Sequence, residues 1–202
     1  MGEDNLSIES LSASLKQAGH ETALAFDPSL FNESMYFHLP WLERLFSQRA
    51  KVVRKIVRLQ PDLVAISVFA NNYRWACEIA EGVKRHLPVP VIFGGVFATS
   101  CPDTVIGNPN VDIVCVGEGE QAIVELAESM AKGEIDCTIR NLWFKKDGEV
   151  VRNPVRPLQD LDALPVFDKS LFENDIIVGN RYYTLMSKGC LCVCSYCSQS
   201  FL

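Results

Sequence analysis

Apolar positions in the first 133 residues follow two alternating patterns. In one, hydrophobic residues recur three or four positions apart, as on one face of a helix. In the other they form short continuous runs, which are typical of strands buried on both faces. The helical pattern covers Ile8, Leu11, Leu15 and Ala18, then residues 41–59, then Ala76, Ile79, Ala80 and Val83, and finally Ile123, Leu126, Ala127 and Met130; the strands are expected at residues 22–26, 63–69, 89–93 and 111–116. This alternation predicts an α/β fold, with a doubly wound parallel sheet and helices on both faces.

The pattern changes after Gly133. Asp147 and Gly148 form a strong turn signal between two short apolar runs, which predicts a β-hairpin. Residues 153–180 contain three prolines and show no sustained period, as expected of a linker. A further strand is expected at residues 182–186. The predicted parts are an α/β domain at residues 1–135, a hairpin and linker at residues 136–180, and the start of another domain at residues 181–202.

The composition is that of a folded chain with 48% hydrophobic and 22% charged residues and a formal charge of −6. Phosphate binding needs clustered Lys and Arg. The one basic stretch, residues 49–58, alternates with apolar residues at helical spacing, which favours a solvated helix face over a binding patch. No apolar run reaches the ~20 residues that cross a bilayer, and the first residues lack the pattern of a signal peptide. We therefore expect a cytoplasmic protein without a nucleic-acid or membrane partner.

Four of the eight cysteines fall within eight residues, namely Cys190, Cys192, Cys194 and Cys197. A cytosolic chain keeps its thiols reduced, so this clustering indicates a metal or catalytic site rather than disulfides. Cys190, Cys194 and Cys197 have the spacing CxxxCxxC. Three thiolates so placed can converge on one face of a cubane iron-sulfur cluster and leave its fourth iron open.

Two other metal sites stay open as alternatives. Zinc prefers two separated ligand pairs, and the sequence has neither a second CxxC nor a close pair of histidines. A four-cysteine site would include Cys192, but two residues separated by one position point to opposite sides of an extended chain. We therefore interpret Cys192 as a bystander. The histidines, His20, His38 and His86, are isolated in the sequence, and we interpret each as structural.

Small or polar residues lie at the ends of three of the predicted strands: Ser67 near the end of the strand at residues 63–69, and Gly94 with Gly95, and Gly117 with Glu118, after the next two strands. The carboxyl ends of the strands border the ligand crevice in an open α/β sheet, and glycine lets a large ligand approach the backbone. Each glycine alone is explained by a tight turn. Three such strand ends on one edge favour a binding site. A Walker lysine motif and a full GxGxxG are absent, so nucleotide binding of those types has little support.

Residues 189–197, GCLCVCSYC, resemble the cluster loop of radical S-adenosylmethionine (radical SAM) enzymes. The resemblance implies a 4Fe-4S cluster on the three cysteines of the CxxxCxxC spacing, with SAM bound to the fourth iron. It also implies that Tyr196 lies near the adenine of SAM. The loop departs from members with cobalamin domains at Leu191 and Cys192, where those proteins usually carry Pro and an aromatic residue.

From about Asn5 to its end, the chain is similar to cobalamin-binding-domain radical SAM proteins. The similar segments are residues 61–69, 94–99, 116–120 and 158–165. In that family the corrin rests over the strand ends of a flavodoxin-like sheet and its nucleotide tail enters the sheet. The resemblance therefore implies that Ser67, Gly94, Gly95, Gly117 and Glu118 lie beside cobalamin. A DxHxxG motif, which supplies an axial histidine in other cobalamin proteins, is missing, so the resemblance implies a cobalt without a protein imidazole.

The resemblance also implies that this chain is a fragment of a longer protein. The family's sheet has a strand before the helix that begins near Asn5, and its barrel would begin at Tyr182 and run for far more residues. In the strand order 2-1-3-4-5, the missing strand lies between residues 22–26 and residues 63–69. Its absence is expected to leave two interior sheet edges unpaired.

The function that this sequence favours is that of a cobalamin-dependent radical SAM enzyme, in which a 4Fe-4S cluster reductively cleaves SAM for methyl transfer or a related radical reaction. Such an enzyme needs an electron donor and a small-molecule substrate. The alternative is a non-catalytic module that binds cobalamin, an iron-sulfur cluster or zinc. For these 202 residues alone we expect binding without turnover. We assign no catalytic residue, because the residues that select the substrate would belong to the barrel.

Overall fold

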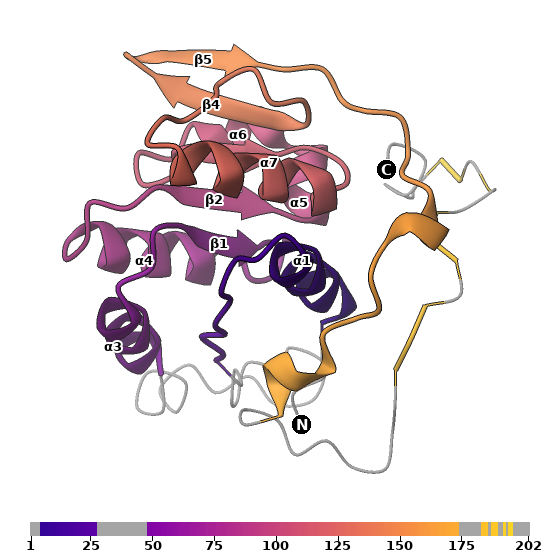
Figure 1. The fold of residues 1–202 in the computed structure, drawn as a ribbon. Helices are drawn as coiled ribbons and strands as arrows, with labels where there is room; N and C mark the ends of the chain where they lie inside the picture. Colours follow the sequence, from indigo (N-terminus) through magenta and orange to yellow (C-terminus); the bar gives the residue numbers. More distant parts are fainter. Residues whose placement is uncertain are drawn as a thin grey trace.

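The computed structural model describes residues 5–27, 48–173, 183–185, 187–189, 192, 194 and 195. They form one sheet with helices on both faces (Figure 1). The helices are α1 (Leu6–Gln17), α3 (Arg49–Leu59), α4 (Tyr73–Lys84), α5 (Val96–Ser100), α6 (Pro102–Ile106) and α7 (Glu120–Ala131). The strands are β1 (Val64–Ser67), β2 (Val91–Gly94), β3 (Ile113–Cys115), β4 (Leu142–Lys146) and β5 (Glu149–Arg152), and two 3₁₀ helices follow, η1 (Leu161–Ala163) and η2 (Lys169–Phe172). None of the described helices is long and apolar enough to cross a membrane.

The sheet has the strand order β1-β2-β3-β4-β5. The first three strands are parallel, with Ser67 of β1 opposite Gly94 of β2. Strand β4 pairs antiparallel with β3, and β5 pairs antiparallel with β4, so the sheet is mixed. The parallel part is built from the expected βα units. The predicted α/β fold class is confirmed.

The predicted hairpin is also confirmed, as strands β4 and β5. Lys146 pairs with Glu149, so Asp147 and Gly148 alone make the turn. Both turn residues have positive φ, 51° and 84°. A two-residue turn of this kind matches the twist of the strands and favours Asp-Gly. Strand β4 pairs with β3, so the hairpin extends the sheet by two strands.

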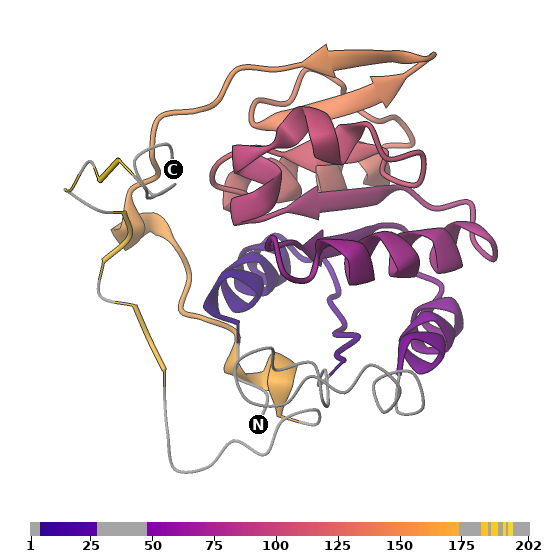
Figure 2. The same cartoon turned by 180° about the vertical axis from the view of Figure 1, so that it is seen from behind.

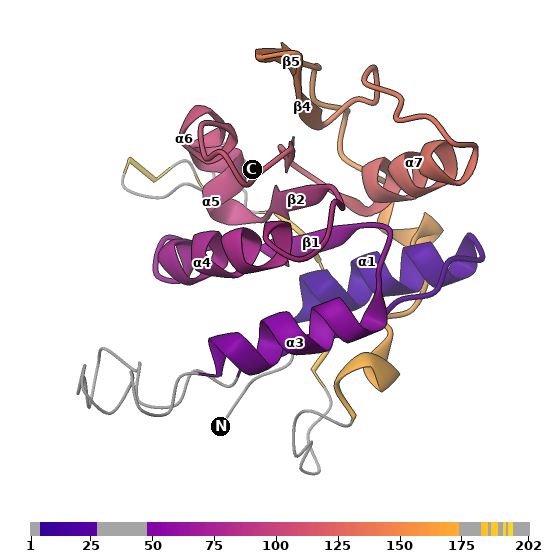
Figure 3. The same ribbon diagram turned by 90° about the vertical axis from the view of Figure 1, so that its left-hand side faces the viewer.

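Helices α3 to α6 lie on one face of the sheet, and α1 and α7 lie on the other (Figure 3). An apolar cluster fills each side. The larger one joins the strands to α3, α4, α5 and α6, and it includes the predicted stripe of α4, in which Ala76, Ile79, Ala80 and Val83 are all buried. The smaller one joins β2, β3 and β4 to α7. Helix α1 packs beside α7 on that second face. The expected coverage of both faces is therefore observed.

Helix α3 carries the basic stretch. Its buried side is apolar, with Val52 4% and Ile56 7% exposed, and it packs on α4. Lys51 and Arg54 are exposed. The helix ends at Gln60, which adopts a left-handed conformation directly before a proline. Lys51 and Arg54 therefore lie on the exposed side of the helix, as predicted, and the absence of a nucleic-acid partner stays a prediction.

The expected burial of α1 is wrong. The fully buried positions of this helix are mostly polar, namely Glu9, Ser10, Ser12, Ala13 and Ser14, whereas Ile8, Leu11 and Leu15 are half-buried and Ala18 is exposed. The reason is the polar surface that covers this side. Asp168, just before η2, accepts a hydrogen bond from Ser12 Oγ at 2.5 Å and lies 2.6 Å from Lys16 Nζ. Lys169 Nζ lies 2.7 Å from the buried Glu9 carboxylate.

Two predicted strands are not found. Residues 22–26 belong to no helix or sheet, and within the described part of the chain β1 pairs only with β2. This segment is held by side chains instead: Thr22 Oγ1 is 2.7 Å from Ser12 Oγ, and Phe26 packs edge-on against Phe172. Residues 183–185, the described part of the strand predicted at 182–186, form no strand either.

Candidate functional site

The carboxyl ends of β1 and β2 lie side by side and carry three of the predicted site residues. Gly95 has a φ of 96°, and a Cβ atom there would lie 3.0 Å from Val68 O and 3.2 Å from Ser67 Oγ. The chain itself therefore requires glycine at this position, because a side chain would be both strained and crowded. Gly95 makes the turn into α5, and its backbone carbonyl accepts the N–H of Thr99.

Gly94 differs, because there is space beside it. An added Cβ would meet only Cys115 Cβ, at an ordinary 3.5 Å. Side chains alternate along a strand, so Gly94 shares a face with Ile92, and Ala65 shares a face with Ser67. Ala65 is exposed, and Ser67 and Gly94 are half-buried. Small residues thus leave the second face of the sheet open where β1 and β2 end.

Two exposed apolar side chains border the same strand ends. Phe69 follows β1 and is 41% exposed, and Val96 begins α5 and is 37% exposed. An open face of small residues with an apolar border leaves space for a large, flat ligand. These strand ends therefore have room for the ring of a corrin.

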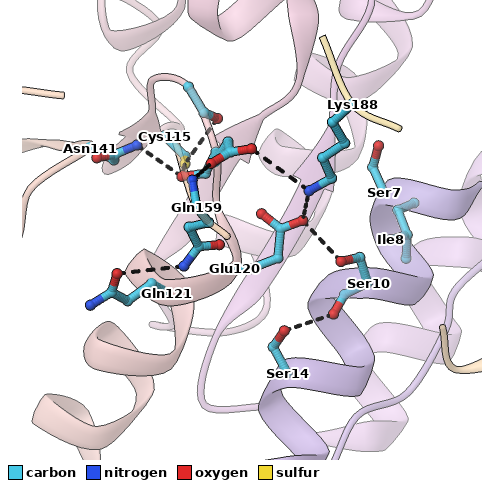
Figure 4. A network of polar contacts seen from close by, with 12 residues as sticks. Ser7, Ile8, Ser10, Ser14, Cys115, Glu120, Gln121, Asn141, Gln159 and Lys188 are labelled. Atoms are coloured by element: carbon cyan, nitrogen blue, oxygen red, sulfur yellow. Dashed lines mark hydrogen bonds and ion pairs between the residues drawn. The ribbon is translucent and has the colours of Figure 1, made fainter. Parts of the chain in front are cut away.

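The turn that follows β3 is closed by the chain's own contacts (Figure 4). A Cβ on Gly117, whose φ is 84°, would lie 3.2 Å from both Asn141 Nδ2 and Val155 Cγ1. The Glu118 carboxylate accepts the backbone N–H of Gln159 at 2.7 Å. Glu118 therefore holds the linker, no space is left for a side chain at Gly117, and the contact of both residues with cobalamin stays a prediction.

Asn141 completes this turn, and the sequence reasoning missed it. It is 1% exposed and has a φ of 71°. Its Nδ2 donates to the carbonyl of Glu118 at 2.9 Å, and its Oδ1 accepts the N–H of Arg156 at 2.8 Å. One side chain thus joins the turn after β3 to the linker. No periodicity or motif in the sequence signals this role.

Glu120, the first residue of α7, is the buried acid of the site. It is 6% exposed, and its carboxylate accepts a hydrogen bond from Ser10 Oγ at 2.9 Å and pairs with Lys188 Nζ. Burial opposes ionisation of this carboxyl, but the contacts with Lys188 and Ser10 outweigh it and hold the pKa of Glu120 below its ordinary value. Glu120 is therefore a carboxylate, stabilised by a cation from far along the chain.

Comparison with known families assigns the domain. Residues 3–127 match the family described as B12 binding domain. The chain belongs to the B12-binding domain family. The strand ends just described lie within the matched residues, so this B12-binding domain has its open face where the sequence predicts cobalamin.

Relatives of the B12-binding domain chain include two curated enzymes. An uncharacterized methyltransferase of Pyrococcus horikoshii is 31% identical over 161 residues, which are 77% of this chain and 34% of that protein. The anaerobic magnesium-protoporphyrin IX monomethyl ester cyclase of Rubrivivax gelatinosus is 28% identical over 160 residues, 74% of this chain and 29% of that protein. The chain thus spans about a third of the length of these relatives.

A solved structure has the same fold. TsrM from Kitasatospora setae, a radical S-adenosylmethionine methyltransferase solved with cobalamin and a [4Fe-4S] cluster bound, superposes with a TM-score of 0.58. The two proteins are 19% identical, and the match covers 80% of this chain and 28% of TsrM. At this sequence identity, the likeness shows a shared fold.

The predicted metal ligands lie mostly outside the described residues. Cys194 is described and half-buried, and Cys192 is described and exposed, whereas Cys190, Tyr196 and Cys197 are not among the described residues. Within the described part of the chain, no three His, Cys, Asp or Glu side chains gather into a metal site. The iron-sulfur site stays a prediction.

The two described histidines lie away from the open strand ends. His86 follows α4, on the side of the sheet where β2 begins, and its Nδ1 is 2.8 Å from the carbonyl of Gly82. His20 follows α1. His38 is outside the described residues. The interpretation of His20 and His86 as structural stays a prediction.

Proposed function

We propose that this chain is the cobalamin-binding part, and the beginning of the cluster-binding part, of a cobalamin-dependent radical SAM enzyme. The observation that supports this most is the order of features in one chain: a B12-binding domain at residues 3–127, followed by CxxxCxxC at Cys190, Cys194 and Cys197. Methyl transfer or a related radical reaction is the proposed reaction class, because similar proteins include both a methyltransferase and a cyclase.

Cobalamin would lie over the carboxyl ends of β1 and β2. Ser67, Gly94 and Gly95 would contact it, and the open face beside Gly94 would take its nucleotide tail. When bound, cobalamin supplies a cobalt centre that can carry a methyl group. The protein residues at this edge bind and orient the cofactor, and we propose that no imidazole of the chain reaches the cobalt.

The iron-sulfur cluster would be held by three thiolates, which suit a 4Fe-4S cubane with one open iron. SAM would bind that iron, and Tyr196 would lie near its adenine. When bound, the cluster would pass one electron to SAM for its cleavage. An external electron donor would reduce the cluster beforehand. The small-molecule substrate would be selected by residues beyond this chain, because the relatives extend well past the matched part.

Anaerobic reconstitution tests the cluster. We expect about one 4Fe-4S cluster per chain by iron and sulfide analysis. Cys190→Ala, Cys194→Ala and Cys197→Ala should each abolish it, whereas the matched control Cys192→Ala should leave the iron content unchanged. Tight zinc binding without iron uptake, or equal sensitivity at Cys192, would contradict the assignment.

Binding of aquacobalamin tests the other cofactor. Gly94→Leu should weaken binding, because the side chain would enter the open face, whereas Ala131→Leu at the exposed end of α7 should not. Replacing His20, His38 and His86 together should leave the cobalt spectrum unchanged. Nitrogen superhyperfine splitting from a protein imidazole in the Co(II) electron paramagnetic resonance spectrum would refute the proposal on the axial ligand.

The alternative function, a binding module without turnover, is favoured for the 202 residues alone, since they span about a third of the relatives. The reconstituted, reduced chain should bind cobalamin and SAM without releasing 5′-deoxyadenosine. Release of that product at a catalytic rate would show that the chain is active by itself.

A further inference from the structure

Lys188 makes a contact that its place in the sequence does not suggest. It lies two residues before Cys190, yet its ammonium group pairs with Glu120, 68 residues earlier, at the start of α7. The Lys188 side chain is 27% exposed and that of Glu120 only 7%. The segment that leads into the cysteines therefore touches the B12-binding domain at a buried charge (Figure 4).

The charge balance around Glu120 favours this contact. Lys188 Nζ also lies 3.9 Å from the Glu118 carboxylate, so one ammonium faces two carboxylates. A buried carboxylate without a cation is strongly disfavoured. Arg156, the other cation near this turn, pairs with Glu125. Among the described residues, Lys188 thus supplies the positive charge that faces both Glu118 and Glu120.

The same acids are held from two further segments. Ser10 Oγ of α1 donates to the Glu120 carboxylate at 2.9 Å, which aims the carboxylate. The Glu118 carboxylate accepts from Gln159 N at 2.7 Å, which fixes the linker. The linker runs along the edge of the molecule from β5 to η2 (Figure 2). The turn after β3 is therefore the point where α1, the linker and Lys188 meet.

We propose that Lys188 is a positioning residue, which with Glu120, Glu118 and Ser10 fixes the segment leading into the cysteine cluster against the carboxyl end of β3. That end belongs to the same sheet edge as the open face of β1 and β2. A consequence, which rests on the proposed function, is that the iron-sulfur cluster and cobalamin are held at a set separation by one edge of the sheet.

Trypsin offers a direct test on the chain without cofactors, because it cuts after a lysine only when that side chain can leave its partners and enter the protease. The chain contains a matched reference bond. Lys132–Gly133 and Lys188–Gly189 are both Lys-Gly bonds, and their glycines have similar φ values of 87° and 84°. Lys132 is exposed at the end of α7. Initial rates at both bonds are measured in one sample by mass spectrometry.

We expect the bond after Lys188 to be cut about tenfold more slowly than the reference bond, because cleavage follows the population in which the ion pair is open. Glu120→Gln should raise the ratio of the two rates about tenfold. Glu128→Gln, which changes an exposed acid of the same helix, should leave it unchanged. Equal ratios in the two variants would overturn the proposal.

If Glu120→Gln speeds cleavage at both Lys-Gly bonds, as a loss of folding would, a second variant tests the ion pair. Ser10→Ala keeps the charge pair but removes the hydrogen bond that aims the carboxylate, so the ratio should rise by about threefold, less than in Glu120→Gln. An unchanged ratio in a folded Ser10→Ala chain would overturn the proposal.

The cofactor-loaded chain separates this inference from the proposed function. Lys188→Met should keep the iron and sulfide content of the unaltered chain but change the dipolar broadening of the Co(II) spectrum by the reduced cluster. Unchanged broadening would refute the positioning role in the loaded chain. A chain that takes up neither iron nor cobalamin would instead refute the proposed function, and the trypsin ratio would still report on the ion pair.

Discussion

Replacement of Asn141 by alanine should destabilise the domain strongly, although this residue lies in no helix and just before a strand. Its buried side chain makes two part-buried hydrogen bonds, to Glu118 O at 2.9 Å and from Arg156 N at 2.8 Å. Its backbone is left-handed, with a φ of 71°. Alanine would remove both hydrogen bonds and also the short polar side chain that makes Asn one of the few non-glycine residues to adopt this conformation readily.

The size of the effect follows from these contacts. Each hydrogen bond contributes about 1 kcal/mol to the free energy of unfolding. Left-handed alanine costs about 1 kcal/mol more. The sum is about 3 kcal/mol, a large share of the about 5–15 kcal/mol that stabilises a typical domain. For a chain of this size it corresponds to a fall in Tm of about 6–12 °C.

Calorimetric and urea unfolding of the cofactor-free chain measure this effect. Asn141→Gly should be about 1 kcal/mol less damaging than Asn141→Ala, because it loses the same hydrogen bonds without the backbone strain. Asn71→Ala, at an exposed loop position after β1, should stay within about 0.5 kcal/mol of the unaltered chain. If Asn141→Ala proved as mild as Asn71→Ala, or Asn141→Gly proved worse than alanine, the reasoning would be refuted.

Three further changes test other parts of the structure. Gly95→Ala should lower Tm by several degrees, because residue 95 has a positive φ and the new Cβ would lie 3.0 Å from a backbone carbonyl oxygen. Gly94→Ala should melt like the unaltered chain, and similar Tm values for the two variants would contradict this. Burial raises the pKa of the Cys115 thiol to about 12, so iodoacetamide at pH 8 should alkylate exposed Cys101 and spare Cys115 in the folded chain, and mass spectrometry reads the result. Burial opposes ionisation of Asp168, but hydrogen bonds from a lysine and two serines outweigh it and hold its pKa below the ordinary value. The stability that this carboxylate adds is therefore present above the pKa of an unfolded Asp, about 4, and is lost as the pH falls through the lower pKa of the folded state. The difference in the free energy of unfolding between the unaltered chain and Asp168→Asn should shrink in acid. A difference that stays constant with pH would contradict this.

Local pattern determined much of the fold. The stripe of α4 is buried because its side chains face the sheet at every helical repeat, and Asp147 with Gly148 closes the hairpin because both residues tolerate positive φ. Strands β2 and β3 were recognisable because burial on both faces demands a continuous apolar run. The family assignment rests on the same local segments, since the matched residues 3–127 contain most of them.

Tertiary contacts decided the rest. Helix α1 buries serines and Glu9 rather than its leucines, because the linker returns Asp168 and Lys169 to that side. Residues 22–26 have the composition of a strand, but a strand also needs a partner at hydrogen-bonding distance, and among the described residues these have none in the sheet. The contact of Gly117 and Glu118 with a ligand, predicted from their place at a strand end and from the family resemblance, stays a prediction. The partners of the turn after β3, Asn141 and Lys188, come from distant segments, and a single sequence carries no local signal for a hydrogen bond or ion pair that forms only when those segments meet.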